Sequence, residues 1–262
     1  MIKIKDIIIY PVKGLAGISL NECLALEKGL EHDRRFMLVE PDGKFISQRE
    51  YPKLALFKTK ILGEHLEISY GNSELRIPLL KEETKLQVVT VWEHNVEAYR
   101  SDPSIDEWFS DHLGKSCLLV YMNEQNSRVK LLNKSPDTTQ VSFADGYPYL
   151  FLGTESMELL NQKMGLDYKI DRFRANIILE TVESHIEDTL DHVSFSGTAF
   201  RMIKPCARCQ VTTIDQNTGK RGKEPLKTLA TYRKKDHKIY FGMNAVCLTE
   251  GKIRVGDVLE TI

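Results

Sequence analysis

This chain of 262 residues has no excess of charge of either sign, no long apolar run and few cysteines. Its 36 lysines and arginines are balanced by 37 aspartates and glutamates, which leaves a net charge of −1. The chain therefore lacks the concentrated basic surface of a nucleic-acid-binding protein, and we expect no nucleic-acid partner. No apolar stretch approaches the roughly 20 residues that cross a bilayer, so we expect no membrane span.

The amino terminus lacks the apolar core of a signal peptide, because residues 1–6 alternate in charge. The five cysteines are mostly isolated, which is typical of a reducing compartment without a disulfide framework. We therefore expect a cytoplasmic protein. Internal repeats and low-complexity linkers are also absent, and the length fits one large domain or two smaller ones.

Alternating apolar and polar residues dominate the first hundred positions and predict β-strands. A strand over 3–10 ends at Pro11. Pro41 and Asp42-Gly43 predict the turn of a hairpin over 36–47, and Gly63-Glu64 joins a second hairpin of 57–62 with 65–70. Further strands are predicted over 86–92, 175–179, 199–203, 210–214 and 252–255.

Helical spacing occurs twice. Ser104 begins one predicted helix, with Glu107 completing a capping box and Gly114 ending it, and a second helix runs from Thr154 to Gly165. Many short strands with few helices predict a mainly β fold (α+β) with twisted, barrel-like sheets. We place a domain boundary near residues 95–105, which gives domains of 1–100 and 101–262.

The run Lys204-Pro205-Cys206-Ala207-Arg208-Cys209 contains the only close pair of cysteines in the chain. Thiolate sulfur is a ligand for soft metals, and a neighbouring guanidinium favours the thiolate over the thiol. Structural zinc needs four ligands, yet Cys117 and Cys247 stand alone and no histidines have matching spacing. A thioredoxin-type pair precedes a helix, whereas strand-like residues follow Cys209. A metal-centred redox site is therefore the leading hypothesis.

Several further blocks occur in a fixed order over nearly the whole chain. In the second half they are 143–148, 172–177, 205–209, 212–215, 218–219, 224–229 and 232–233. In the first half they are the motif Tyr10-Pro11-Val12-Lys13-Gly14, 29–30, 33–36 and 41–43. The first set resembles the MOSC domain of molybdenum cofactor sulfurases and of the mitochondrial amidoxime-reducing component. The second set is similar to the N-terminal β-barrel region that accompanies it, so the resemblance implies an N-terminal β-barrel-like region followed by a MOSC β-barrel domain.

The resemblance implies a site for molybdenum cofactor (Mo-molybdopterin), a phosphorylated pyranopterin whose dithiolene sulfurs hold the metal. In the amidoxime-reducing relatives the second cysteine of the motif binds molybdenum, which implies Cys209 as the metal ligand and catalytic residue. We expect Arg208 to contact the cofactor and to keep this thiol ionised. Cys206 is not implied as a ligand and is expected to be a packed or neighbouring thiol.

By the same resemblance, the phosphate and pterin lie in a cradle formed by Lys13, the backbone of Gly14, Arg34, Arg174 and Asn176. Arginine suits this task because its planar fork binds phosphate in a bidentate way, while lysine acts as a point charge.

Two details of the cradle depend on register. Counting back from Gly43 places Arg34, rather than Arg35, at the cofactor-contacting arginine of the family. Asn176 lies two residues after Arg174, which predicts that the two side chains share one face of a strand. The turn at 145–148 is explained equally well by structure and by ligand contact.

Two residue types outside the cradle are given structural roles. We expect Trp92 and Trp108 in the core. Asp215 is a candidate for positioning the loop that carries Cys209.

The resemblance implies an oxidoreductase that uses molybdenum to reduce N-hydroxylated small molecules, namely amidoximes, hydroxylamines and N-hydroxylated bases. The chain has neither a further cysteine cluster for an iron–sulfur centre nor a Gly-x-Gly-x-x-Gly nucleotide fingerprint. We therefore expect electrons from a separate ferredoxin-, flavodoxin- or cytochrome b5-like protein. The alternative is a sulfur carrier or transferase that holds a persulfide on Cys209 and delivers sulfur to metal centres. A third is a cofactor-binding module without turnover.

Overall fold

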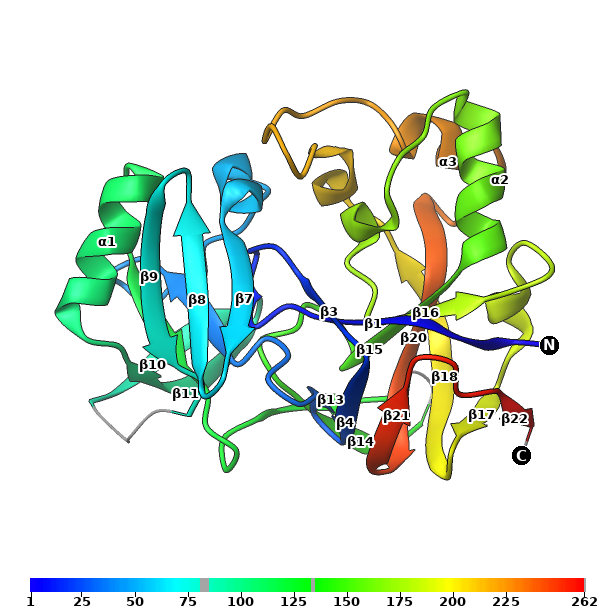
Figure 1. Cartoon of the computed structure of the whole chain (residues 1–262), viewed down its shortest axis with the longest axis horizontal. Coiled ribbons are helices and arrows are strands. Elements are labelled where there is room, and N and C mark those ends of the chain that lie inside the picture. The colour runs from blue at the N-terminus through cyan, green and yellow to red at the C-terminus, as the bar shows by residue number, and fades with distance from the viewer. Residues whose placement is uncertain (81–84, 133–134, 262) are drawn as a thin grey trace.

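The computed structural model describes residues 1–80, 85–132 and 135–261. Within these ranges the chain is mostly strand, which confirms the mainly β prediction. Three α-helices accompany the strands there: α1 (Pro103–Leu113), α2 (Thr154–Met164) and α3 (Leu226–Tyr232). Figure 1 shows two lobes, one carrying α1 on the left and one carrying α2 and α3 on the right.

The two longer helices end where the sequence places a glycine. Gly114 and Gly165 have left-handed φ angles of +75° and +63°, which glycine adopts at low cost. The start of α1 differs from the prediction. Asp102, rather than Ser104, is the N-cap, and its carboxylate accepts the Ser104 N–H at 2.9 Å. Pro103 fits the first helical position, where its missing N–H costs no hydrogen bond, so the helix begins before Ser104.

The right-hand lobe is built on a nine-stranded sheet. Every residue of β15 is buried, as is typical of a strand covered on both faces. Tyr149, Phe151, Phe195 and Phe200 form an aromatic core on this sheet. In hydrogen-bonding order the strands are β22 (Glu260–Thr261), β17 (His192–Phe195), β18 (Thr198–Ala207), β20 (Lys238–Thr249), β15 (Tyr149–Gly153), β16 (Ile177–Glu180), β1 (Lys3–Ile9) and β3 (Ile18–Leu20), with β19 (Lys234–Lys235) paired to β20.

The left-hand lobe contains a five-stranded sheet. Its order is β10 (Leu86–Val91), β11 (His94–Arg100), β12 (Leu118–Tyr121), β6 (Phe36–Val39) and β2 (Val12–Lys13). The predicted 36–47 hairpin forms in part. Its turn is closed by the Gly43 N–H, which donates to the Glu40 carbonyl at 2.8 Å, and the Ile46 N–H donates to the Leu38 carbonyl at 2.8 Å beside a bridge of Val39 with Phe45. The second arm adds no named strand to the sheet, and the four buried residues of β6 make their longer ladders with β12 and β2. β12 pairs with β6 along its whole length, whereas β2 pairs only with Phe36 and Met37.

Three smaller sheets complete the described part of the chain. They are β7 (Lys58–Leu62) with β8 (His65–Tyr70) and β9 (Ser73–Pro78), β21 (Gly251–Arg254) with β4 (Glu22–Leu26) and β5 (Gly29–Leu30), and β13 (Arg128–Leu131) with β14 (Thr138–Val141). The predicted 57–70 hairpin is confirmed, with Lys58 opposite Ser69 and Leu62 opposite His65. The predicted strands at 3–10, 86–92, 175–179, 199–203 and 252–255 correspond to β1, β10, β16, β18 and β21. Among these residues the sheets are open in strand order rather than closed barrels.

Residues 10–14 connect the two lobes. β1 pairs with β16 and β3 in the nine-stranded sheet, and three residues later β2 pairs with β6 in the five-stranded sheet. Both sheets therefore contain strands from before and from after residue 100. The division into domains of 1–100 and 101–262 stays a prediction. The crossing brings the motif that ends in Lys13 and Gly14 to the junction of the lobes.

The predicted strand at 210–214 is wrong. Gln210–Thr213 form a 3-10 helix, η4, directly after β18 ends at Ala207. The Cys209 carbonyl accepts both the N–H and the hydroxyl of Thr212, at 3.2 and 3.0 Å, and these bonds close the helical turn. The remaining 3-10 helices in the described ranges are η1 (Pro52–Leu56), η2 (Ile170–Phe173) and η3 (Ile186–Thr189).

Candidate functional site

Lys13 enters a cleft at the junction of the lobes from the end of β2. Its side chain is buried, and Nζ donates to the Phe143 carbonyl at 2.7 Å and forms a short ion pair with Asp145. Burial lowers the pKa of Lys13 to about 8, and the Asp145 carboxylate only partly opposes this shift. Gly14 follows with a φ of +90°, a conformation that favours glycine, and the chain turns away there.

Asp145 lies opposite Lys13, and 68% of its side chain is open to the cleft. The surrounding protein removes water and raises its pKa, but the charge and hydrogen bond of Lys13 and a 3.0 Å bond from Trp92 Nε1 outweigh this effect. The pKa of Asp145 therefore lies below its usual value. The core prediction for Trp92 is wrong, because this side chain is 38% exposed and lines the cleft, stacked under the Arg49 guanidinium at 4.4 Å.

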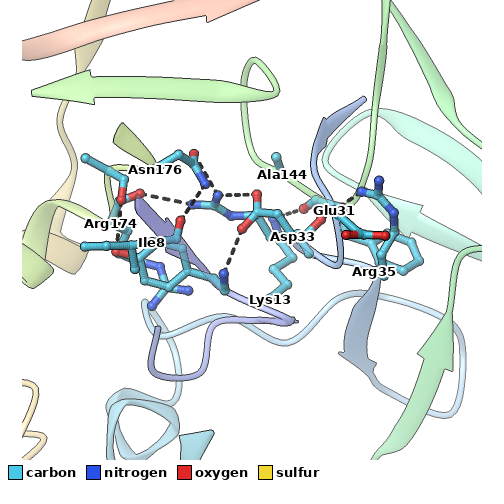
Figure 2. A network of polar contacts seen from close by, with 12 residues as sticks. Ile8, Lys13, Glu31, Asp33, Arg35, Ala144, Arg174 and Asn176 are labelled. Atoms are coloured by element: carbon cyan, nitrogen blue, oxygen red, sulfur yellow. Dashed lines mark hydrogen bonds and ion pairs between the residues drawn. The ribbon is translucent and has the colours of Figure 1, made fainter. Parts of the chain in front are cut away.

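Arg34 joins the two halves of the cleft. Its three hydrogen-bond partners, Asp33, Arg174 and Asn176, are labelled in the polar network of Figure 2. One terminal nitrogen donates to Asp33 at 2.5 Å and to the Asn176 side-chain oxygen at 3.0 Å, and the other donates to the Arg174 carbonyl at 3.1 Å. Burial lowers the pKa of Arg34, but the Asp33 carboxylate outweighs it, so the pKa lies above its usual value. Arg35 lies behind the cleft, buried against Glu124. Arg34 thus lines the cleft and Arg35 does not, and the role of Arg34 as a cofactor contact stays a prediction.

Arg34 contacts both Arg174 and Asn176, but these two residues do not lie together on one face of a strand, as the sequence predicted. Arg174 lies outside the strand, at the end of η2, with a left-handed φ of +55°, and β16 begins only at Ile177. The prediction that the two side chains share one strand face is therefore wrong. The left-handed turn instead directs the Arg174 carbonyl toward Arg34, while Nη1 donates to the Leu15 carbonyl at 2.6 Å.

The Arg174 guanidinium is only partly satisfied by the protein. Nη2 is buried and has no hydrogen-bond partner among the described residues. Burial lowers its pKa to about 10, and the neighbouring charge of Arg34 adds to this effect. Tyr10 contacts both guanidinium groups, with Arg174 and Arg34 at 4.2 and 4.6 Å from its ring centre. An anion in the cleft would supply the missing acceptor.

The cysteine pair lies on the opposite wall, where β18 leads into η4. Both thiols are partly exposed, and both line the cleft. Arg208 is fixed by bonds from Nη1 to Cys206 Sγ at 3.0 Å and from Nη2 to the Phe173 carbonyl at 2.5 Å. The predicted contact between Arg208 and the Cys209 thiol is therefore wrong. The guanidinium instead donates to the sulfur of Cys206. Its fork is directed back along the chain because the buried Phe173 carbonyl offers the second acceptor.

Arg172 holds this wall in place. Its buried guanidinium donates to the Ile214 carbonyl at 2.9 Å and to Asp215 at 2.6 Å. Asp215 also accepts the N–H groups of Asn217 and Thr218, so it fixes the turn that follows η4. These contacts match the expectation that Asp215 positions the loop, and they bury Arg172 as a structural residue.

One cleft of about 180 Å³ brings together every predicted site residue. Lining it are Lys13, Gly14, Arg34, Arg174, Asn176, Arg208 and Cys209. Tyr147 also lines it, in the 145–148 turn for which ligand contact is one of two interpretations, and so does Trp92, which the sequence predicts in the core. Sequence reasoning missed Gln48 and Arg49, which line the cleft as well and which no motif marks. The roles of the predicted residues as cofactor contacts stay predictions.

The cleft residues alone do not make a metal site. Within the described ranges, no three His, Cys, Asp or Glu side chains converge as ligands. A metal here would have to bring most of its own ligands. Nor does any described helix combine the length and apolar character needed to pass through a bilayer.

The sequence matches two adjoining families of known domains. Residues 1–116 match the MOSC N-terminal beta barrel domain, and residues 138–260 match the MOSC domain. The mouse mitochondrial amidoxime-reducing component 1 is 30% identical over 95% of this chain and 79% of its own length. The chain belongs to the MOSC family.

Other MOSC proteins are similar over most of the chain. The human mitochondrial amidoxime-reducing component 1 is 27% identical over 95% of this chain and 80% of its own length. The molybdenum cofactor sulfurase of Drosophila erecta is 30% identical over 88% of this chain, but the match spans only 30% of the sulfurase. This MOSC protein therefore corresponds to about a third of the sulfurases that it matches.

The residues of the cleft fit a phosphorylated cofactor that carries its own metal ligands. The buried Arg174 Nη2 lacks an acceptor, and Lys13, Arg34 and Arg174 gather positive charge in one place. Only a single partly exposed thiolate would be needed from the protein, and Cys209 lies on the opposite wall. Anion donors on one side and a soft ligand on the other match the two ends of such a group.

Proposed function

We propose that this MOSC protein is a molybdenum-cofactor-dependent oxidoreductase that reduces N-hydroxylated compounds with electrons from a separate donor protein. One observation carries the proposal: Cys209 lines the same cleft as three cations from three different segments, one buried and two partly buried. The similarity to two amidoxime-reducing components over nearly the whole chain supports the reaction class. When bound, the cofactor supplies two-electron reduction and accepts the oxygen of the N–O bond.

Different residues would bind different parts of the cofactor. Lys13, Arg34 and Arg174 would bind the phosphate, and the Asn176 amide, fixed by Arg34 and the Ile8 carbonyl, would orient the pterin. Cys209 would bind the metal. Because Arg208 is fixed on Cys206, its contribution is to hold the two walls together through the Phe173 carbonyl.

The experiment compares the two cysteines. The protein is produced in a host that makes molybdenum cofactor, molybdenum per chain is measured by elemental analysis, and benzamidoxime reduction is measured with reduced methyl viologen as donor. We expect Cys209→Ala to lose more than about a hundredfold in rate, because the metal loses its only protein ligand. Cys206→Ala is the matched control and should keep most of the activity. Equal rates for the Cys209 variant and the parent protein would overturn the assignment.

The sulfurase relatives favour a second candidate, a sulfur carrier that holds a persulfide on Cys209. Partial exposure of this thiol in an open cleft is compatible with sulfur transfer. The two functions differ in a simple measurement. A carrier purified without molybdenum would release thiocyanate on treatment with cyanide, and this release would be absent in Cys209→Ala but present in Cys206→Ala.

A further inference from the structure

A second recess continues from the cleft and opens more widely to solvent. It has a volume of about 420 Å³ and shares the turn at 145–147 and the Cys206-Ala207 edge with the cleft of Cys209. Lys130 on β13, Lys204 on β18 and Arg49 from the opposite lobe form its walls. Cations from three separate elements therefore surround one concave space.

These cations lie around aromatic rings rather than carboxylates. The Nζ atoms of Lys130 and Lys204 are each 5.4 Å from the centre of the Tyr147 ring, and the Arg49 guanidinium covers Trp92. In the part of the chain that the structure describes, none of the three forms an ion pair with a carboxylate.

The remaining charged groups of the recess do not neutralise it. Asp145 is already paired with Lys13, and Glu93 is the other acidic residue of the wall. Arg128 adds a buried guanidinium that donates to the Ser142 carbonyl at 3.0 Å. Burial lowers the pKa of Lys130, and the like charges of Lys204 and Arg128 lower it further. Crowded cations of this kind are stabilised by an anion that binds between them.

The shape of the recess indicates a small anion rather than a protein surface. Ligand pockets enclose a few hundred cubic ångströms, whereas a stable protein contact needs about 800 Å² from each partner. Because the recess is continuous with the cleft, a molecule whose anionic group lies between Lys130 and Lys204 can extend toward Cys209. The group is therefore at one end of the molecule and the reacting atoms are at the other.

We propose that the recess binds a phosphate group of the substrate, so that the protein prefers phosphorylated N-hydroxylated compounds, such as N-hydroxylated nucleotides, to their uncharged counterparts. This inference rests on the proposed function, because it assigns the outer part of the same site. Lys130 and Lys204 are then specificity-determining residues. They do not contact the reacting atoms.

Binding is tested first, without turnover. Titration calorimetry compares cytidine 5′-monophosphate with cytidine on the cofactor-loaded protein, and we expect about tenfold tighter binding of the nucleotide. The double variant Lys130→Ala/Lys204→Ala should lose this preference. The matched control is Lys60→Ala/Lys235→Ala, which removes two exposed lysines that do not line the recess and should keep it. Equal binding of nucleotide and nucleoside by the parent protein would overturn the proposal.

Turnover supplies the second arm. For N4-hydroxycytidine and its 5′-monophosphate, the Lys130/Lys204 variant should raise the ratio of nucleotide KM to nucleoside KM about tenfold. If the parent protein reduces neither compound, the proposed function fails, while the calorimetry still decides on the recess.

Two other occupants would also overturn the proposal. A nucleotide released from the extracted cofactor would assign the recess to a dinucleotide form of that cofactor. A change confined to the KM of the electron-donor protein would make the recess a docking surface.

Discussion

The buried carboxylate of Asp33 links the crossing segment to the cleft, and the Asp33→Asn substitution tests its contribution to stability. Asp33 is completely buried, and it accepts the Tyr10 backbone N–H at 2.7 Å and the Arg34 guanidinium at 2.5 Å. Asparagine keeps the shape but removes the charge, and its NH2 replaces one of the two acceptor oxygens. Each hydrogen bond to a charged group contributes about 1.5–3 kcal/mol, roughly twice that of a neutral bond. Losing one such bond and halving the other therefore costs about 3 kcal/mol.

For a chain of this size, about 3 kcal/mol lowers the melting temperature by about 6–12 °C. The measurement is a thermal melt followed by far-ultraviolet circular dichroism at pH 7. Asp42→Asn is the matched control, because Asp42 is exposed in a turn and accepts only the Lys44 N–H at 3.1 Å. That variant should change stability by less than about 0.5 kcal/mol. If both variants melt at the same temperature, the buried charge adds nothing and the reasoning is refuted.

Two further predictions concern the walls of the cleft. Because the pKa of Lys13 is about 8, its ammonium loses its proton as the pH rises from 7 to 9, and sulfate binding to the cofactor-free protein should weaken about tenfold. Lys13→Arg should flatten this calorimetric pH profile, and an unchanged profile would contradict the assignment. Arg172→Met removes the bonds to Asp215 and the loop backbone, so trypsin should cleave after η4 about tenfold faster. Arg76→Met, which breaks an exposed pair with Glu67, should leave that rate unchanged, and equal rates in both variants would refute a holding role for Arg172.

Local signals account for the elements that the sequence predicts correctly. The 57–70 hairpin follows from alternation around Gly63, and the ends of α1 and α2 follow from Gly114 and Gly165. Each of these features depends on residues within a few positions of one another. Sequence patterns are informative at that range because backbone sterics and turn chemistry decide the outcome.

The incorrect predictions have both long-range and local causes. The hairpin around Gly43 forms only in part, because the longest ladder of β6 is with β12, from a distant part of the chain. The turn after Cys209 is helical, although 210–214 alternates like a strand, because the N–H and hydroxyl of Thr212 both donate back to the Cys209 carbonyl. Trp92 is apolar enough for the core, yet Asp145 and Arg49 hold it at the cleft.

Residue type and local spacing are enough to predict the mainly β composition, the glycines that end α1 and α2, and the order of motifs that identifies the MOSC family. The folded structure was needed to show that Arg208 contacts Cys206 rather than Cys209, and that Arg174 approaches Arg34 through a left-handed turn. It also placed Lys130, Lys204 and Arg49 around one recess. These juxtapositions arise where sheets from two lobes meet, and such long-range pairings are fixed by packing and buried hydrogen bonds, which no short stretch of sequence records.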